Sequence, residues 1–307
     1  MTEIESTDTD ESLFGDRNIK SHLAKVIEKF DEMYGASESC SGLTTGLGDF
    51  DQLTSGLHPS DLIIIAGRPS MGKTALAMSM IEHIALCCKK AAIFFSLEST
   101  PETLALKFIS SVGRINSHWL RTAQIEDEYW PRITSAVQLL SEAPIYIENV
   151  LGETISSICA KAHDISEICE EVGIVVVDYV QLLCRSGSSP ENRTAELSAI
   201  IRQLKILAKE LNAPVLAISQ LNRSLEQRYD KRPIMSDLRD SGSIEDDADM
   251  ICFIYRDEYY NQDSPDRGTA ELIVAKHRNG PIGKVRTAYI DKYNRFEDLV
   301  FSFSSDV

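Results

Sequence analysis

The feature that most constrains the fold of this chain is the octapeptide Gly-Arg-Pro-Ser-Met-Gly-Lys-Thr at residues 67–74. An apolar run at 62–66 precedes it, and apolar residues at helical spacing follow it from 73 to about 88. The pattern GxxxxGK[ST] between a buried strand and a helix is typical of a loop whose backbone N–H groups converge on an anion. We therefore expect a strand, a tight glycine-containing loop and a helix in direct succession.

Short apolar runs alternate with longer helical stripes along the rest of the chain. Further strands are expected at 91–97, 145–147, 174–177, 214–219 and 250–255, with helices at 155–168 and 197–211. This alternation predicts βαβ units and a mainly parallel sheet flanked by helices, an α/β fold. Two apolar segments, 269–276 and 285–290, are separated by Asn-Gly-Pro and predict an antiparallel extension at the C-terminal end.

The octapeptide has the chemistry of a nucleotide-binding P-loop. In such a loop the lysine reaches the β- and γ-phosphates and the hydroxyl of the last residue ligates Mg²⁺, while the helix that follows directs its positive end at the anion. These roles fall to Lys73 and Thr74 and predict ATP and Mg²⁺ as ligands. The candidate nucleotide-binding residues are Gly67, Arg68, Pro69, Ser70, Met71, Gly72, Lys73 and Thr74.

Two carboxylates follow apolar strands that neighbour the P-loop in the expected sheet. Asp178 ends the run Ile-Val-Val-Val and is a candidate magnesium residue, the alternative being a strand-end or turn residue. Glu98 ends the run Ile-Phe-Phe-Ser-Leu and is a candidate general base, the alternative being a solvated acid. Two strand-end carboxylates beside one P-loop favour hydrolysis over nucleotide storage.

Three further polar residues lie at expected strand ends. Gln220 follows the strand at 214–219, where it is either a γ-phosphate contact or an ordinary loop residue. Lys276 and Arg278 stand two residues apart before the turn at Asn279-Gly280. Such a pair stabilises phosphoryl charge, within the chain or across a subunit boundary, or else forms a solvated basic turn.

Composition and charge limit the classes of function. The net charge of -16 disfavours a nucleic-acid partner, but six of the acidic residues fall within the first sixteen, and DNA binding requires only a local surface. The seven cysteines form no CxxC pair and are expected to be buried, reduced, small apolar residues, and the six histidines show no metal-ligand spacing. No apolar run approaches the ~20 residues of a membrane span, and the acidic N-terminus is unlike a secretory signal, so a cytoplasmic protein is expected.

The chain divides into four expected regions. Residues 1–16 are polar and acidic and predict a disordered tail, while 17–35 carry an apolar stripe that predicts a helix. Residues 36–41 predict a flexible connector, and 42–307 a single α/β domain. The stripe of the helix packs either on its own domain or on a neighbouring subunit.

With these residues assembled, the chain resembles the C-terminal motor domain of the DnaB-type replicative DNA helicases. The resemblance covers about residues 19–303 and runs through several ordered blocks. The blocks include TTGLGDFDQLTSGLHPSDLIIIAGRPSMGKT, IFFSLE, VVVDYVQLL, LAISQLNRSLEQR, SDLRDSGSIEDDADMICFIYRDE and AKHRNGPIG. It implies a RecA-like fold, a hexameric ring, ATP sites at subunit interfaces and 5′-to-3′ translocation on single-stranded DNA that unwinds the duplex.

The resemblance also implies roles for individual residues. Glu98 matches the catalytic glutamate of the family, Asp178 the second magnesium residue and Gln220 the γ-phosphate sensor, and Lys276 and Arg278 match the pair that acts on a neighbour's nucleotide. DNA contact falls to three residues of the channel loop: Arg239, Asp240 and Gly242. Asp240 departs from the family pattern, which has Glu at this position.

The N-terminal region is the main departure from the family. Its members carry a helical collar domain that meets primase, whereas here the acidic segment 1–16 precedes the helix at 17–35, which resembles the family's subunit-docking linker helix. The expected partners are therefore single-stranded DNA, further copies of the chain, and either primase or a helicase loader. The alternatives are a recombinase or loader that hydrolyses ATP on DNA without unwinding it, and a regulatory helicase subunit.

Overall fold

A computed structural model describes residues 19, 23, 26–27, 40–184 and 189–299. The chain forms two compact units, Met1–Ser41 and Gly42–Val307. In the first unit the described residues Ile19, Leu23, Val26 and Ile27 are helical and exposed. The tail expected at 1–16 lies outside the described residues, as do most of the helix expected at 17–35 and of the connector.

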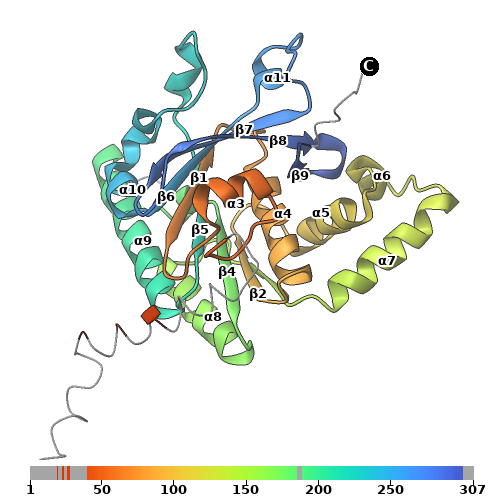
Figure 1. Cartoon of the computed structure of the whole chain (residues 1–307), viewed down its shortest axis with the longest axis horizontal. Helices are drawn as coiled ribbons and strands as arrows, with labels where there is room; N and C mark the ends of the chain where they lie inside the picture. Colours follow the sequence, from red (N-terminus) through yellow and green to blue (C-terminus); the bar gives the residue numbers. More distant parts are fainter. Residues whose placement is uncertain (1–18, 20–22, 24–25, 28–39, 185–188, 300–307) are drawn as a thin grey trace, which may run out of the picture. The chain divides into compact units, whose positions relative to one another are not determined.

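In the second unit, the described residues form one nine-stranded sheet in the order β3-β2-β4-β5-β1-β6-β7-β8-β9 (Figure 1). Pairings from β3 to β6 are parallel, and those from β6 to β9 are antiparallel. The strands are β1 (Leu62–Gly67), β2 (Ala91–Ser96), β3 (Ile145–Asn149), β4 (Val172–Asp178), β5 (Val215–Gln220), β6 (Met250–Tyr255), β7 (Thr269–His277), β8 (Gly283–Ile290) and β9 (Arg295–Asp298). The predicted α/β sheet with an antiparallel C-terminal extension is confirmed.

Helices connect the parallel strands. The helices are α3 (Gly48–Thr54), α4 (Lys73–Leu86), α5 (Pro101–Gly113), α6 (Ser117–Thr122), α7 (Trp130–Ser141), α8 (Ile155–Ile168), α9 (Pro190–Glu210), α10 (Gly242–Asp247) and α11 (Asp257–Tyr260). Short 3₁₀ turns are η2 (Asp127–Tyr129), η3 (Val180–Leu183), η4 (Arg223–Gln227), η5 (Met235–Ser241) and η6 (Asp291–Tyr293). No described helix is both long and apolar enough to cross a membrane.

Two apolar cores lie on opposite faces of the sheet. Alternate strand residues face α4 and α5 on one side, where Leu76 and Phe108 are buried. The other strand residues face α8, α9 and α10, where Ile158 and Leu204 are buried (Figure 1). Because both faces are covered, the parallel strands are apolar without interruption, which is why their sequences appear as continuous apolar runs.

The register brings several strand ends to one edge of the sheet. Gly67 at the end of β1 lies beside Gln220 at the end of β5, and Ser96 at the end of β2 lies beside Asp178 at the end of β4. Ligands of open α/β sheets bind at this carboxyl edge. We call it the nucleotide edge.

Strand β7 runs in the opposite direction to its neighbour β6. Glu271, near the start of β7, pairs with Tyr255, whereas Lys276 pairs with Ile251 and His277 with Met250. The two ends of β7 therefore lie toward opposite edges of the sheet, with Glu271 at the nucleotide edge.

Candidate active site

A cavity of about 590 Å³ opens above the P-loop at the nucleotide edge. Its lining comes from four strand ends, the start of α4, α5, and the C-terminal segment around η6. The lining residues are Pro69, Ser70, Gly72, Lys73, Thr74, Ala75, Glu98, Lys107, Asp178, Tyr179, Gln220, Tyr289, Asp291 and Asn294. The volume lies within the range of ligand-binding pockets.

The P-loop turns sharply into α4 at Gly72. Its φ of 95° lies in the left-handed region that glycine adopts without strain, and a Cβ there would meet the Phe296 ring at 3.1 Å. Lys73 Nζ donates to the carbonyl oxygen of Arg68 at 3.1 Å, which holds the side chain back over the loop. Burial lowers the pKa of Lys73, and Asp178 and Glu98 oppose this shift.

Thr74 and Asp178 form the predicted hydroxyl–carboxylate pair. Thr74 Oγ1 donates to Asp178 Oδ2 at 2.6 Å across two elements that are 104 residues apart. Asp178 is buried, and this desolvation raises the pKa of its carboxyl while the Thr74 hydrogen bond opposes the shift. A buried carboxylate beside a hydroxyl supplies the oxygen ligands that Mg²⁺ prefers.

Glu98 and Gln220 flank this pair. Glu98 follows β2 and is exposed at the cavity, and the backbone N–H of Leu97 donates to the carbonyl oxygen of Asp178 at 2.8 Å, which ties the two strand ends together. Gln220 is held by the side chain of Gln181, whose Oε1 accepts from the Gln220 N–H at 3.2 Å. The structure thus brings Lys73, Thr74, Glu98, Asp178 and Gln220 around one cavity.

Three of the eight P-loop residues do not line this cavity. Gly67 ends β1, and Met71 is buried in the apolar core. The Arg68 guanidinium is buried and donates to the carbonyl oxygen of Leu221 and to Glu226, both at 2.8 Å. Arg68 therefore attaches the P-loop to the segment that follows β5.

Other residues of the site were not expected from the sequence. Arg256 donates to the carbonyl oxygen of Ser70 at 3.1 Å and stacks on the Tyr289 ring at 4.0 Å, so it supports the P-loop from β6. Gln181 orients Gln220 and donates to Ser219 Oγ at 2.8 Å. Lys107 adds a second cation to the cavity wall. No local spacing marks these residues, because the fold alone brings them to the cavity.

Lys276 and Arg278 lie apart from this cavity, toward the opposite edge of the sheet. Lys276 Nζ donates to the carbonyl oxygens of Glu245, of Asp246 at 3.4 Å and of Ala248 at 2.7 Å. Arg278 donates to the Asp246 carbonyl oxygen at 3.0 Å and pairs with the Asp249 carboxylate at 3.3 Å. The two cations therefore bind the end of α10 and do not reach the P-loop of their own chain.

The predicted DNA-binding residues lie in the connection between β5 and β6. Arg239 and Asp240 are part of η5, and Gly242 begins α10. The structure describes their backbone and not their side chains. Their position places them directly before the helix whose end Lys276 and Arg278 bind.

The cysteines are free thiols, but their burial differs from the expectation. Cys252 is buried in β6, whereas Cys87 is exposed and the other five are partly buried. The expectation of buried, apolar cysteines is wrong for Cys87, because it lies just past the end of α4 at the surface. Among the described residues, no three His, Cys, Asp or Glu side chains gather as a metal cluster.

The chain is similar to several known helicases. The family model described as "DnaB-like helicase C terminal domain" matches residues 42–298. The replicative DNA helicase DnaB of Geobacillus stearothermophilus is 44% identical over 92% of this chain, and the chain spans 62% of that relative's length.

Two solved structures agree with these matches. One, the structure of an isolated ATPase domain, superposes with a TM-score of 0.85 at 35% identity and covers 92% of this chain and 99% of its own. A second, of a DnaB-like replicative helicase and its interactions with primase, gives a TM-score of 0.82 at 35% identity over 92% of this chain and 67% of its own. With the P-loop, the two carboxylates and the mixed sheet in place, the chain belongs to the DnaB-like helicase C-terminal domain family.

Proposed function

We propose that this chain is an ATP-driven DNA helicase that translocates on single-stranded DNA and unwinds the duplex, in the 5′-to-3′ direction, during replication in the cytoplasm. One observation supports it most. Lys73, Thr74, Glu98, Asp178 and Gln220 surround one cavity at the nucleotide edge. The names of the relatives support the assignment to replication.

In this proposal ATP lies along the P-loop with its γ-phosphate toward Gln220. Lys73 contacts the β- and γ-phosphates, and the backbone N–H groups of the loop up to Thr74 surround them. Thr74 and Asp178 would hold a Mg²⁺ ion, which supplies charge neutralisation at the phosphates when bound. The hydrogen bond from Thr74 to Asp178 keeps the oxygens of both side chains oriented toward the position of such an ion.

Glu98 is the general base in this proposal. It takes a proton from water as the water oxygen bonds to the γ-phosphorus and the bond to the β–γ bridging oxygen breaks, which gives ADP and phosphate. Its exposure at the cavity leaves room for that water. Gln220, held by Gln181, then reports the loss of the γ-phosphate to the connection that follows β5.

Lys276 and Arg278 act on the nucleotide of a neighbouring subunit. Their position toward the opposite edge from the P-loop supports action between chains, since neither contacts the cavity of its own chain. This arrangement requires an adjacent copy of the chain, and we propose that the copies close into a hexameric ring with residues 42–307 as the motor domain. The segment 17–35, most of which lies outside the described residues, is proposed as the linker that docks on the adjacent subunit.

DNA passes through the channel of this ring in the proposal. Arg239, Asp240 and Gly242 contact its backbone, one set from each subunit, which reconciles binding with an acidic chain. A primase or a helicase loader is the further partner. One similar structure is of a DnaB-like replicative helicase and its interactions with primase, which supports that class of partner.

The test is ATP hydrolysis with and without single-stranded DNA, combined with displacement of a labelled strand. We expect DNA to stimulate hydrolysis, strand displacement to require ATP, and Lys73→Ala to abolish both while the protein stays folded. Hydrolysis stimulated by DNA without strand displacement would favour the recombinase or loader alternative. A wild-type chain that does not hydrolyse ATP but alters another helicase's activity would favour the regulatory subunit.

A further inference from the structure

The connection between β5 and β6 carries the proposed DNA contacts, and it is held by specific ion pairs before and after them. It leaves the nucleotide edge at Gln220 and returns to the opposite edge at Asp249, whose carboxylate accepts from the Leu62 N–H at 2.8 Å. The contacts around Arg239 to Gly242 lie between these two points. The inference below rests on the proposed function of that loop.

A closed turn precedes the loop. Arg228 forms a bidentate pair with the buried Asp237, with Nη1–Oδ1 at 3.1 Å and Nη2–Oδ2 at 2.8 Å. The same carboxylate accepts from the Ile234 N–H at 2.8 Å, and the Asp237 carbonyl oxygen accepts from the Asn222 N–H at 3.3 Å. These contacts close the chain from 228 to 237 into a turn that ends two residues before Arg239.

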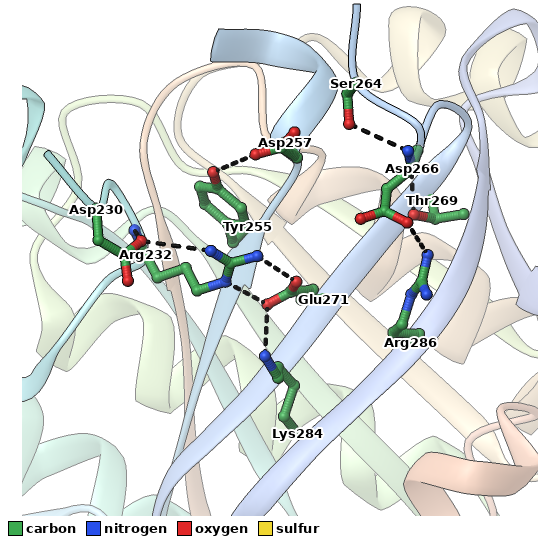
Figure 2. A network of polar contacts seen from close by, with 10 residues as sticks. All are labelled: Asp230, Arg232, Tyr255, Asp257, Ser264, Asp266, Thr269, Glu271, Lys284 and Arg286. Carbon is green, nitrogen blue, oxygen red and sulfur yellow. Dashed lines mark hydrogen bonds and ion pairs between the residues drawn. The ribbon is translucent and has the colours of Figure 1, made fainter. Parts of the chain in front are cut away.

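Arg232 attaches this closed turn to β7. Its Nε and Nη2 donate to the two carboxylate oxygens of Glu271 at 2.9 and 2.8 Å, and its guanidinium lies over the Tyr255 ring at 4.7 Å (Figure 2). Hydrogen bonding to Glu271 raises the pKa of Arg232. Burial alone would raise the pKa of the Glu271 carboxyl, but the pairing with Arg232 outweighs burial and lowers it. Lys284 contacts the same carboxylate at 3.3 Å (Figure 2).

Three of the five N–H donors of Arg232 are engaged. Glu271 takes Nε and Nη2, and Asp230 accepts from Nη1 at 3.4 Å. Because the Nε–Nη2 edge, which would bind a phosphate through two hydrogen bonds, is occupied by Glu271, the geometry fits a structural anchor better than a DNA contact.

Strand β7 also holds the far side of the loop. Five residues beyond Glu271, Lys276 binds the end of α10 through the Ala248 carbonyl oxygen. At the rise of a β-strand the two points are about 17 Å apart. One strand thus anchors the connection on both sides of the proposed DNA contacts.

We propose that Arg232 is a positioning residue for DNA-stimulated ATP hydrolysis. Through Glu271 it fixes the position of the loop at 239–242 relative to β7. Strand β7 also carries Lys276, which in the proposed function acts on a neighbouring nucleotide. The loop therefore transmits DNA contact to hydrolysis only while this anchor holds.

The experiment measures basal hydrolysis, and its stimulation by oligo-dT, in the full chain carrying Arg232→Gln or Glu271→Gln. We expect basal hydrolysis within about twofold of wild type, and a rise in the half-stimulating DNA concentration of about tenfold, the effect of losing one charge-assisted hydrogen bond that positions the loop. If Arg232 contacted DNA directly, Glu271→Gln would free it and preserve or improve stimulation, which would overturn the proposal. Combining Arg232→Glu with Glu271→Arg is expected to recover part of the stimulation.

The matched control is Arg286→Gln. Arg286 of β8 pairs with Asp266 in the turn that precedes β7, and this ion pair does not involve the closed turn (Figure 2). Hydrogen–deuterium exchange of residues 235–247 adds a readout independent of activity. Exchange there is expected to be faster in both anchor variants and unchanged in Arg286→Gln.

The outcomes separate the two proposals. A wild-type chain without DNA stimulation contradicts the proposed function, and the exchange measurement then still decides whether the anchor orders the loop. A wild-type chain stimulated by DNA, with Arg232→Gln stimulated to the same extent and unchanged in exchange, overturns the inference alone. Thermal unfolding of each variant excludes a general loss of structure.

Discussion

The parallel strands β1 to β6 and the antiparallel strands β7 to β9 of this sheet differ in their burial and in where they carry polar residues. Strands β1, β2 and β6 are buried along their whole length, between helices on both faces. In β7 and β8, buried residues alternate with more accessible ones. The accessible positions of the antiparallel half carry the ion pairs of Glu271 and Arg286 (Figure 2).

The two halves therefore place their polar residues differently. Strands β1, β2, β4 and β5 carry charged and amide side chains only at or just past their ends, where Glu98, Asp178 and Gln220 line the cavity. Strands β7 and β8 carry charged residues along their length, and Glu271 binds the turn that contains Arg232. Three sets of variants test this comparison, beginning with the largest effect that we expect.

Arg278→Ala tests the proposed action of this cation, which lies just after β7, on the nucleotide of the neighbouring subunit. We expect kcat for ATP to fall by about 10³-fold or more, the usual effect of losing an arginine finger. The measurement is steady-state hydrolysis with single-stranded DNA, in preparations whose ring assembly is checked by mass photometry.

Mixing this variant with Lys73→Ala subunits provides its control. Each variant is inactive alone, but about a quarter of the interfaces in an equimolar ring join an intact Lys73 to an intact Arg278. Recovered hydrolysis on mixing supports action between chains. Assembled mixed rings that stay inactive contradict it.

Core substitutions compare how the two halves contribute to stability. Phe94→Ala, in fully buried β2, is expected to lower the free energy of unfolding by about 3–5 kcal/mol. Val285→Ala, in β8, loses fewer buried atoms and is expected to cost about 1–2 kcal/mol. Urea denaturation of both variants checks the order, and equal costs would remove this distinction between the halves.

The last test concerns the contact of Glu82 on α4 with Arg295 on β9, which joins the two halves. Burial raises the pKa of Glu82 from an ordinary 4.5 to about 7, although Arg295 opposes the shift. Folded Glu82 therefore keeps its proton between pH 4.5 and 7, where the unfolded chain has lost it. The free energy of unfolding should fall by about 3 kcal/mol from this group as pH rises through that window.

Glu82→Gln isolates this contribution, because its side chain does not titrate. The difference in unfolding free energy between wild type and variant should change with pH between 4.5 and 7 and be constant below 4.5. A difference that stays constant across the whole range shows that the pKa of Glu82 is the same in the folded and the unfolded chain, contrary to the expectation.

Much of the parallel half could be predicted from the sequence. The expected helix 155–168 and strand 250–255 coincide with α8 and β6, and the P-loop lies between a strand and a helix as its spacing requires. Buried parallel strands are continuous apolar runs, and such runs are the strongest signal in a sequence. The family follows from the ordered motifs.

The elements that were not predicted have weak apolar patterns. In α7, Ala136 is the buried residue, while Val137 and Leu139 are exposed, so no clean stripe marks the helix. Strand β9 has four residues and buries Phe296 against the P-loop. Supporting residues such as Gln181 and Arg256 could not be found, because their partners are distant in sequence.

The three carbonyl oxygens at Lys276 have a consequence for timing. An ammonium group has three hydrogens, and in this structure Glu245, Asp246 and Ala248 offer one acceptor each. If Lys276 serves a neighbour's phosphate, it must first leave the last turn of α10 with unsatisfied carbonyls. Each time Lys276 bound a neighbour's phosphate, α10, which begins at Gly242, would then lose these hydrogen bonds. Hydrolysis at one interface would therefore alternate with DNA binding by the loop at 239–242.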